Sequence, residues 1–531
     1  MEKRISEHRR CDVMVIGAGL SGLACALGLP SGLEVLVITK RPVPTGNTWL
    51  AQGGVAAATG PEDSVEAHLA DTVRAGGGLV DEEVAGKIIE SGPELIARLE
   101  DWGVRLEGSG GGRSGIEGGH SVRRVLHYRD RTGRHISEVL LDECRRRDNI
   151  QILENAFAIN LITASHEVPA LLAPGGDRCL GAYVLHDGVV ETVLARETVL
   201  ATGGAGKVYR YTSNQDSATG DGIAMAARAG LPVRNMEFFQ FHPTCLYHPD
   251  KRNFLVTEAL RGEGARLLNL QGRRFMRDYD PERMELAPRD VVARAIDSEM
   301  KRLGDDHVAL DATHLGEDYL REHFPEVTEG VESVGIRPWL EPIPVVPAAH
   351  YSVGGVVAAP DGATEMLGLR VVGEAASTGF HGANRLGSNS LLEAGVMGLK
   401  AAESMRGSMP EPFDQEVRDW YFGRAEPLEE SVLVDHAWAS MRSVMWDYVG
   451  IVRTDKRLYR AQRLLDVIWK EVEEDYWTLL PSVELLELRN LCTVCRLIVR
   501  SALQRRESRG LHYNLDCPRA VPPPRDTVVR S

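Results

Sequence analysis

The feature that most constrains this chain is a glycine-rich turn, GAGLSG at residues 17–22, between an apolar strand and a helix. Residues 12–16 are predicted as a buried strand, residues 20–29 as the helix, and residues 34–39 as a second buried strand. Strand, helix and strand within about 30 residues predict a βαβ unit and therefore a parallel sheet. Glycines at this spacing permit a tight turn, and the free N–H groups at the helix start can hold a pyrophosphate. The sequence therefore predicts a Rossmann-like dinucleotide site rather than a plain structural turn.

The second strand helps to distinguish between dinucleotides. An acidic residue about 20 positions after such a turn usually binds the ribose of NAD, but this strand ends in Thr39 and Lys40, so NAD is not supported. Further Gly-rich turns follow predicted strands at residues 201–204 and 219–222, and Glu374 can accept ribityl hydroxyls. Ser390 lies at the start of a helix whose positive end can stabilise negative charge on a reduced flavin. These features together favour an extended dinucleotide such as FAD.

Length, charge and cysteine content limit the remaining possibilities. A chain of 531 residues predicts two or three domains. A formal net charge of −15 argues against nucleic acid as a partner, because phosphate contacts need clustered Lys and Arg. Eight scattered cysteines indicate a reducing compartment, which we take to be the cytoplasm. Cys492 and Cys495 form a lone CxxC that is predicted to pack in the core rather than bind metal, and the chain has no 18-residue apolar run, so no membrane insertion is expected.

Changes in composition along the chain predict its domains. Residues 1–232 and 341–415 have strand–turn–helix patterns and are expected to form one domain from two segments, with residues 233–340 inserted between them. Residues 416–531 have helical periodicity. Residues 108–119 contain seven glycines and are predicted to be a mobile loop. The Pro-rich end, AVPPPRDTVVRS, is predicted to be disordered.

Eight motifs, in order, resemble the flavoprotein family of succinate dehydrogenase, fumarate reductase and L-aspartate oxidase. They are GAGLSGL, NTWLAQGGVAA, ATGGAGKVY, TGDGIAMAARAG, EFFQFHPT, TEALRGEGA, AAHYSVGGV and HGANRLGSNSLLE, and they run from about residue 11 to 400. The resemblance implies an α/β fold with a Rossmann-like FAD-binding domain, an inserted, mobile α+β capping domain and a C-terminal helical domain. It also implies that the following residues bind FAD: Gly17, Gly19, Leu20, Ser21, Gly22, Lys40, Thr48, Ala51, Gln52, Gly53, Gly54, Thr202, Gly203, Asp221, Glu374, Ser390 and Leu391.

Three local features resemble the L-aspartate oxidase branch of that family. The segment EGGHSVRR at residues 117–124 is similar to a motif whose Glu contacts the substrate amino group. Asn47 stands where the membrane-complex members carry the His that bonds covalently to FAD, so the resemblance implies a non-covalent cofactor. The segments LNLQGRRFMRDYD, ELAPRDVVARAI and PVVPAAHY are also similar to the versions in this branch.

The resemblance assigns the substrate site to residues from several segments. His242, Thr257, His350 and Arg385 match the carboxylate binders, and Arg385 can form a bidentate fork with a carboxylate. Arg289 matches the catalytic arginine. Glu258 and Arg261 match a proton-relay pair, and their i, i+3 spacing lets them touch on a helix. Glu117 is the residue expected to recognise the ammonium group. No metal site is predicted.

The reaction implied by the resemblance is removal of a hydride from Cα of L-aspartate to FAD, giving iminoaspartate. Oxygen or fumarate is the implied electron acceptor. The product would feed quinolinate synthase in the first step of NAD biosynthesis. Two alternatives stay open at this point: the flavoprotein subunit of a succinate dehydrogenase or fumarate reductase complex, and a non-catalytic flavin-binding sensor or scaffold.

Overall fold

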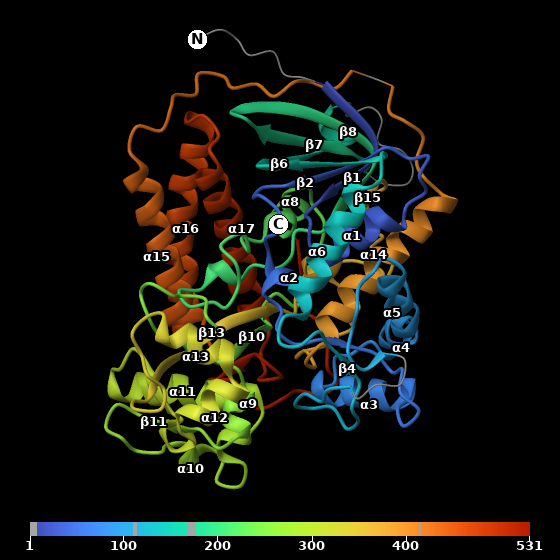
Figure 1. Ribbon diagram of the computed structural model, residues 1–531. Helices are drawn as coiled ribbons and strands as arrows, with labels where there is room; N and C mark the ends of the chain where they lie inside the picture. Colours follow the sequence, from blue (N-terminus) through green and yellow to red (C-terminus); the bar gives the residue numbers. More distant parts are fainter. Residues whose placement is uncertain (1–7, 110–113, 168–176, 415, 531) are drawn as a thin grey trace.

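The computed structural model describes residues 8–109, 114–167, 177–414 and 416–530, so part of the predicted loop 108–119 lies outside it. Its largest sheet has seven strands in the order β5-β2-β1-β8-β7-β6, with β15 also paired to β8 (Figure 1). The strands β5, β2, β1, β8 and β15 run parallel, whereas β6 and β7 add an antiparallel extension. The bounds are β1 (His8–Ile16), β2 (Val35–Thr39), β5 (Ile150–Glu154), β6 (Ala156–Thr163), β7 (Cys179–His186), β8 (Val189–Leu200) and β15 (Leu369–Val371).

The predicted βαβ unit is confirmed. Strand β1 pairs in parallel with β2, and helix α1 (Leu20–Gly28) connects them. At the turn, Gly17 has φ +119°, and a Cβ there would lie 2.2 Å from the carbonyl oxygen of Ala201. Gly22 meets a similar limit, because its Cβ would lie 2.0 Å from the carbonyl oxygen of Gly17. Glycine is therefore required at both positions for the helix to begin this close to the sheet.

Helices cover the sheet and complete this part of the molecule (Figure 1). Helix α14, predicted to begin at Ser390, runs over Asn389–Gly407 and packs against α1. The segment from 63 to 106 contains α3 to α5. The bounds of the smaller elements are α2 (Asn47–Leu50), β3 (Val55–Ala56), α3 (Val65–Ala75), α4 (Glu82–Glu90), α5 (Gly92–Asp101), β4 (Val125–Leu126), α6 (Thr132–Arg145), α7 (Ala164–Glu167) and α8 (Asp221–Arg228).

A second body has its own sheet and its own apolar core. Its strands lie in the order β10-β13-β12-β11, all antiparallel, and its core residues fall between Leu246 and Val346. We propose that this body is the inserted domain of residues 233–340, from which β13 leads back into the FAD-binding domain. Its elements are β10 (Phe239–Leu246), α9 (Ala259–Gly262), β11 (Arg266–Leu268), α10 (Met276–Tyr279), α11 (Arg289–Leu303), β12 (Val308–Asp311), α12 (Glu317–His323), α13 (Pro325–Glu332) and β13 (Ile343–Ser352).

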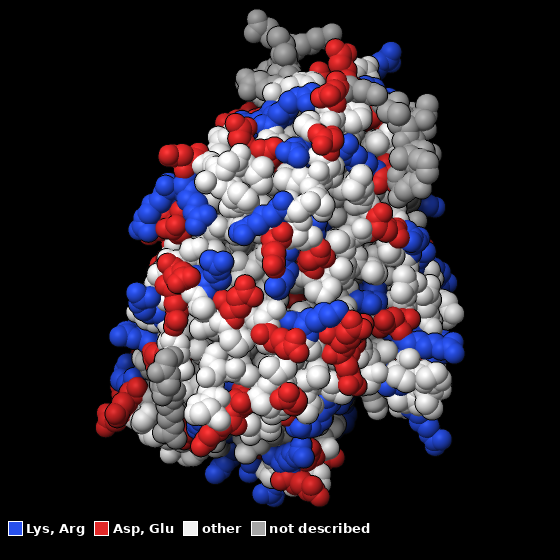
Figure 2. Space-filling model, turned by 90° about the vertical axis from the view of Figure 1, so that its right-hand side faces the viewer, with Lys and Arg blue, Asp and Glu red and all other residues white. Residues whose placement is uncertain are grey.

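The C-terminal region is helical, as predicted. Helices α15 (Ser431–Val449), α16 (Asp455–Thr478) and α17 (Val483–Gln504) pack against one another (Figure 1). Cys492 and Cys495 are fully buried in α17, which confirms their role in packing. Among the described residues, none of the helices combines the length and the apolar character needed to span a bilayer. The face shown in Figure 2 carries acidic and basic side chains interspersed, without a broad area of one sign.

The prediction that the Pro-rich end is disordered is wrong. Strand β19 (Val528–Val529) pairs antiparallel with β9 (Val233–Arg234), in a small sheet with β14 (Gly355–Val357) and β16 (Ala376–Ser377). Asn235 donates to the Asp526 carboxylate over 2.7 Å, and Arg505 donates to the carbonyl of Arg525 over 3.0 Å. Composition suggested disorder, but these distant buried partners fix the backbone. Two short strands, β17 (Val452–Arg453) and β18 (Tyr513–Asn514), pair in the same region.

The tail should contribute to stability through one face of β19. Val529 is 3% exposed and belongs to the main apolar core, whereas its neighbour Val528 is 52% exposed. We expect Val529→Asp to lower the free energy of unfolding by about 2 kcal/mol or more, because it buries a carboxylate. The matched control Val528→Asp should change it by less than about 0.5 kcal/mol. Thermal denaturation measures both, and equal melting temperatures for the two variants would contradict an ordered tail.

Candidate active site

A cavity of about 970 Å³ lies between the carboxyl ends of the parallel strands and the inserted domain. That volume is at the upper end of the usual range for ligand pockets, so it suits a large cofactor with a small substrate. All the predicted cofactor residues line it except Gly22, which acts by close packing instead. All the predicted substrate and catalytic residues line it except Arg261, which lies behind Glu258. The individual roles of these residues remain predictions.

The cofactor half of the cavity suits an anionic dinucleotide. Helix α1 begins with no acidic residue in its first turn and no side-chain cap on Gly19, so its positive end faces the cavity unopposed. Leu20 N–H donates to Thr48 Oγ1 over 3.2 Å, which fixes the NTW segment beside the turn. Gly17, Gly19 and Gly203 keep side chains out of this space. The residues present therefore fit the pyrophosphate and ribose of FAD.

Lys40 is held in the cofactor half by a residue that sequence reasoning missed. Its ammonium lies 2.7 Å from the Asp221 carboxylate and 2.7 Å from that of Glu487. All three side chains are at most 12% exposed. Glu487 belongs to α17, so the C-terminal helices help to position a cofactor-site residue. Glu487 also binds Arg41, from which 446 positions separate it in the chain. A contact between segments this far apart leaves no signal in the sequence.

Glu374 and Asn47 meet where a flavin ribityl chain is expected. Ser352 N–H donates to Glu374 over 2.8 Å. Burial raises the pKa of Glu374 to about 7, although the Asn47 side chain acts to lower the pKa of that carboxyl group. The side-chain amide oxygen of Asn47 accepts from the backbone N–H of Gln215 over 3.1 Å. Asn47 thus presents an amide instead of the imidazole that a covalent bond to flavin would use. This agrees with a non-covalent cofactor.

The substrate half gathers cationic and hydrogen-bonding groups from separate elements. His242 lies on β10, His350 on β13, Arg289 at the start of α11, and Arg385 in the segment before α14. The two imidazole rings are 5.7 Å apart between centroids. Arg385 donates to Ser390 over 2.8 Å and to Gln240 over 3.2 Å, and its guanidinium lies 4.4 Å from the centroid of the Tyr351 ring. Arg385 is thus held by neutral groups.

Burial and the charges of nearby arginines keep the two histidines neutral. Burial lowers the pKa of His242 well below its ordinary value, and the charge of Arg289 lowers it further. Burial likewise lowers the pKa of His350, and so does the charge of Arg385. Ser213 hydrogen-bonds Nδ1 of His350 over 2.8 Å, a contact that the sequence did not indicate. Neutral imidazoles leave the arginines as the positive charges of this half, with the histidines as hydrogen-bonding groups.

The predicted relay residues lie together. Arg289 donates from Nε to the Glu258 carboxylate, and Glu258 lies 3.7 Å from Arg261. Burial alone would raise the pKa of Glu258, but the charges of Arg289 and Arg261 lower it overall. Arg261 is buried and also donates to the carbonyl of Glu285 over 2.6 Å. Arg289 thus contacts Glu258, and Glu258 contacts Arg261, so the three side chains connect the cavity to the interior of the inserted domain.

Glu117 lies between two glycines at the edge of the cavity. A Cβ on Gly53 would be 2.6 Å from one of its carboxylate oxygens, and a Cβ on Gly387 would be 2.4 Å from the other. The negative charge of Glu117 acts on both Arg289 and Arg385. Ser388 follows Gly387 with φ +59°, and its hydroxyl accepts from the N–H of Gly54 over 3.3 Å. Ser388 also lines the cavity, and sequence reasoning did not select it although it stands within the GSNS motif.

Comparisons with known proteins agree with this arrangement. A family model described as FAD binding domain matches residues 12–391, and one described as fumarate reductase flavoprotein C-term matches residues 438–528. The L-aspartate oxidase of Pseudomonas aeruginosa is 49% identical and covers 99% of both chains. A chloroplastic L-aspartate oxidase of Nicotiana tabacum is 41% identical over 97% of this chain and 82% of its own length.

Solved structures are similar over almost the whole chain. A structure of E. coli quinol fumarate reductase superposes with a TM-score of 0.84 and 31% identity, covering 97% of this chain and 93% of the other. A Mycobacterium smegmatis Sdh1 complex superposes with a TM-score of 0.82, also at 31% identity, with 97% and 90% coverage.

The buried carboxyl group of Glu374 should make stability depend on pH. Because its pKa is about 7 in the folded cofactor-free protein and its ordinary value is 4.5, the folded state keeps a proton that the unfolded chain releases. The free energy of unfolding should therefore fall as pH rises from about 4.5 to about 7, by ~1.4 kcal/mol for each unit of pKa difference.

The variant Glu374→Gln removes this contribution. We expect its melting temperature, relative to the unmodified protein, to increase steadily between about pH 4.5 and pH 7. Glu62→Gln, at an exposed position, serves as the control and should follow the unmodified protein. Parallel curves for Glu374→Gln and the unmodified protein would show that Glu374 is ionised throughout this range.

Proposed function

Because this chain belongs to the L-aspartate oxidase family of FAD-binding flavoproteins, we propose that it oxidises L-aspartate to iminoaspartate and passes the electrons to oxygen or fumarate. The single observation that carries this proposal is the joint placement of Glu117, Arg289 and Arg385 on one cavity beside the cofactor residues. L-Aspartate has two carboxylates and one ammonium group at neutral pH. Two arginines and one carboxylate complement this pattern of charge.

Arg385 is suited to bind one substrate carboxylate. It is 8% exposed, it faces the cavity, and its hydrogen-bond partners Gln240 and Ser390 are neutral. A buried guanidinium held only by neutral groups gains from a carboxylate that pairs with its planar fork. Thr257, His242 and His350 supply further hydrogen-bonding groups for the second carboxylate, with the charge of Arg289 beside them.

Oxidation removes a hydride from Cα and a proton from nitrogen, and bound FAD supplies the hydride acceptor. Glu117 pairs with the ammonium group and orients Cα toward the cofactor half of the cavity. When fumarate is the electron acceptor, one alkene carbon would take a hydride and the other needs a proton. Arg289 is the proposed donor, and its pairing with Glu258, together with the charge of Glu117, raises its pKa against the effect of burial, so the resting site keeps it protonated. Glu258 and Arg261 are placed to return that proton.

The two alternatives are less well supported. The similar fumarate reductase structure is 31% identical, against 49% for the bacterial L-aspartate oxidase. A non-catalytic scaffold would not need the set of charged residues around the cavity. As the product is chemically the input for quinolinate formation, we propose quinolinate synthase as a functional partner and NAD biosynthesis as the role. The eight free cysteines support a cytoplasmic location.

Anaerobic mixing tests the function directly. L-Aspartate should bleach the flavin absorbance of the holoenzyme, whereas D-aspartate should not, because it reverses the positions of the ammonium group and the Cα hydrogen. Succinate should bleach it far more slowly, since it leaves Glu117 unpaired. Bleaching by succinate but not by L-aspartate would favour a succinate dehydrogenase, and no bleaching by any of the three would favour a scaffold.

The role of Glu117 is tested by Glu117→Gln, which keeps the shape and removes the charge. Loss of a charge-assisted contact costs about 1.5–3 kcal/mol, so kcat/KM for L-aspartate should fall roughly 10- to 100-fold. Fumarate reduction should change little, because fumarate has no ammonium group. Glu62→Gln, on the surface, is the matched control. Equal losses in both reactions would mean that Glu117 is not the specificity residue.

A further inference from the structure

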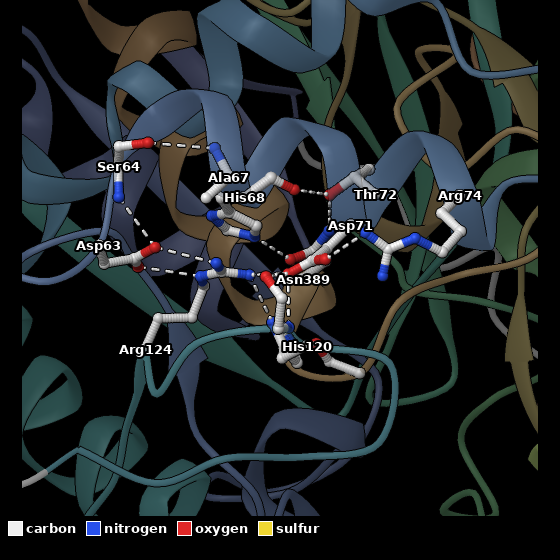
Figure 3. A network of polar contacts seen from close by, with 12 residues as sticks. Asp63, Ser64, Ala67, His68, Asp71, Thr72, Arg74, His120, Arg124 and Asn389 are labelled. Carbon is white, nitrogen blue, oxygen red and sulfur yellow. Dashed lines mark hydrogen bonds and ion pairs between the residues drawn. The ribbon is translucent and has the colours of Figure 1, made fainter.

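A buried ion cluster anchors the segment that follows Glu117 (Figure 3). Arg124 binds Asp63 through two hydrogen bonds of 2.9 Å and Asp71 through one of 2.6 Å. The side chains of all three are at most 1% exposed. Asp71 also accepts from the backbone N–H of Ser121 over 2.7 Å and from its hydroxyl over 2.8 Å. The far end of the segment 117–124 is therefore fixed to helix α3 and to the turn before it.

His120 connects this cluster to the active-site backbone. Arg124 lies 3.0 Å from Nδ1 of His120, and since an arginine only donates, Nδ1 must be the acceptor. The ring proton then sits on Nε2, which donates to the carbonyl of Gly387 over 2.9 Å. Burial lowers the pKa of His120, and the charge of Arg124 lowers it further, so the imidazole stays neutral and keeps this single orientation.

Gly387 is the point at which His120 and Glu117 meet. Its carbonyl accepts from His120, and its Cα forms one wall of the space that holds the Glu117 carboxylate. A second arm of the network reaches the same place. His68 lies 2.8 Å from the side-chain oxygen of Asn389, and Asn389 donates to Thr72 over 3.0 Å (Figure 3). Helix α3 thus holds Asn389, the first residue of α14, directly, and it holds His120 through Asp71 and Arg124.

We propose that His120 and Arg124 are positioning residues for Glu117, and that they set the preference for a substrate that carries an ammonium group. This inference rests on the proposed function. Neither residue lines the cavity, so both must act through Glu117 and Gly387. A carboxylate at the edge of the cavity, next to two arginines, would otherwise be drawn toward those cations and away from the ammonium position. The neutral imidazole and the buried ion cluster hold it against the glycine wall instead.

A purely structural role makes a different prediction from a positioning role. If the network only stabilises the fold, its loss should impair every reaction and the binding of FAD alike. If it positions Glu117, its loss should impair aspartate oxidation selectively. It should also have no additional effect once the charge of Glu117 has been removed. Double-mutant cycles distinguish these cases, because residues that act through one another are not additive.

The test uses the holoenzyme with His120→Leu, which removes both hydrogen bonds, and His120→Gln, whose amide can accept from Arg124 and donate to Gly387. His120→Leu should lower kcat/KM for L-aspartate about 10-fold or more, while fumarate reduction stays within about threefold. His120→Gln should restore most of the loss. In the background of Glu117→Gln, adding His120→Leu should lower aspartate oxidation by less than about twofold. Arg123→Gln, at the exposed neighbour of Arg124, is the control.

A second variant covers the case in which His120→Leu does not fold. Gly387→Ala places a methyl group 2.4 Å from a Glu117 oxygen without touching the ion cluster, and it should give the same selective loss. FAD content and melting temperature are measured for every variant. Equal losses of both reactions, or multiplicative losses in the double mutant, would overturn the proposal. Failure of the proposed function would be distinct, because the unmodified enzyme would then not oxidise L-aspartate.

Discussion

Arg385 is a buried cation, and the described residues supply no carboxylate within salt-bridge distance of it. Neutral groups must therefore stabilise its charge, and much of the fold can be understood from this requirement. An unpaired buried charge costs several kcal/mol unless other groups solvate it. Here the face of Tyr351, the amide of Gln240 and the hydroxyl of Ser390 do so. They come from β13, β10 and the start of α14, which are far apart in the chain. The site can hold this charge only because the second segment of the FAD-binding domain and the strands of the inserted domain meet around it.

Arg289 meets the same requirement in a different way. It stands at the first position of α11 and pairs with Glu258, a carboxylate from the same inserted domain. The two arginines therefore enter the cavity from different parts of the chain, one with a resident counter-ion and one without. This asymmetry fits a substrate with two carboxylates. One carboxylate can bind Arg385 without displacing a protein carboxylate, and the other lies beside the pair of Arg289 and Glu258, which can exchange a proton. The acidic chain, with a net charge of −15, thus concentrates its useful positive charge in one buried place.

The part of this site that the sequence predicts is the part that depends on local geometry. The turn at residues 17–22 demands glycine for steric reasons, so its pattern is visible without a structure. The resemblance implies that Gly22 binds the cofactor, whereas the structure requires glycine there because of its close contact with Gly17. Glu487 and the ordered tail could not be predicted, because the partners of both lie hundreds of positions away, and in the tail a Pro-rich composition hid β19. The resemblance pairs Arg261 with Glu258, and their spacing lets the two touch, yet only the fold places Arg261 behind the cavity wall.

Specificity between similar dicarboxylates cannot come from the arginines, since succinate, fumarate and L-aspartate all present two carboxylates to them. It must come from a group that one substrate satisfies and the others leave unpaired, and a carboxylate in a partly buried site is such a group. The neighbouring arginines attract that carboxylate. The group that holds it in place must therefore be rigid and must present no charge to the cavity. A neutral imidazole, oriented by a buried and fully paired arginine, meets both conditions. The ion cluster along α3 is therefore best understood as part of the recognition of the amino group, although none of its members faces the substrate.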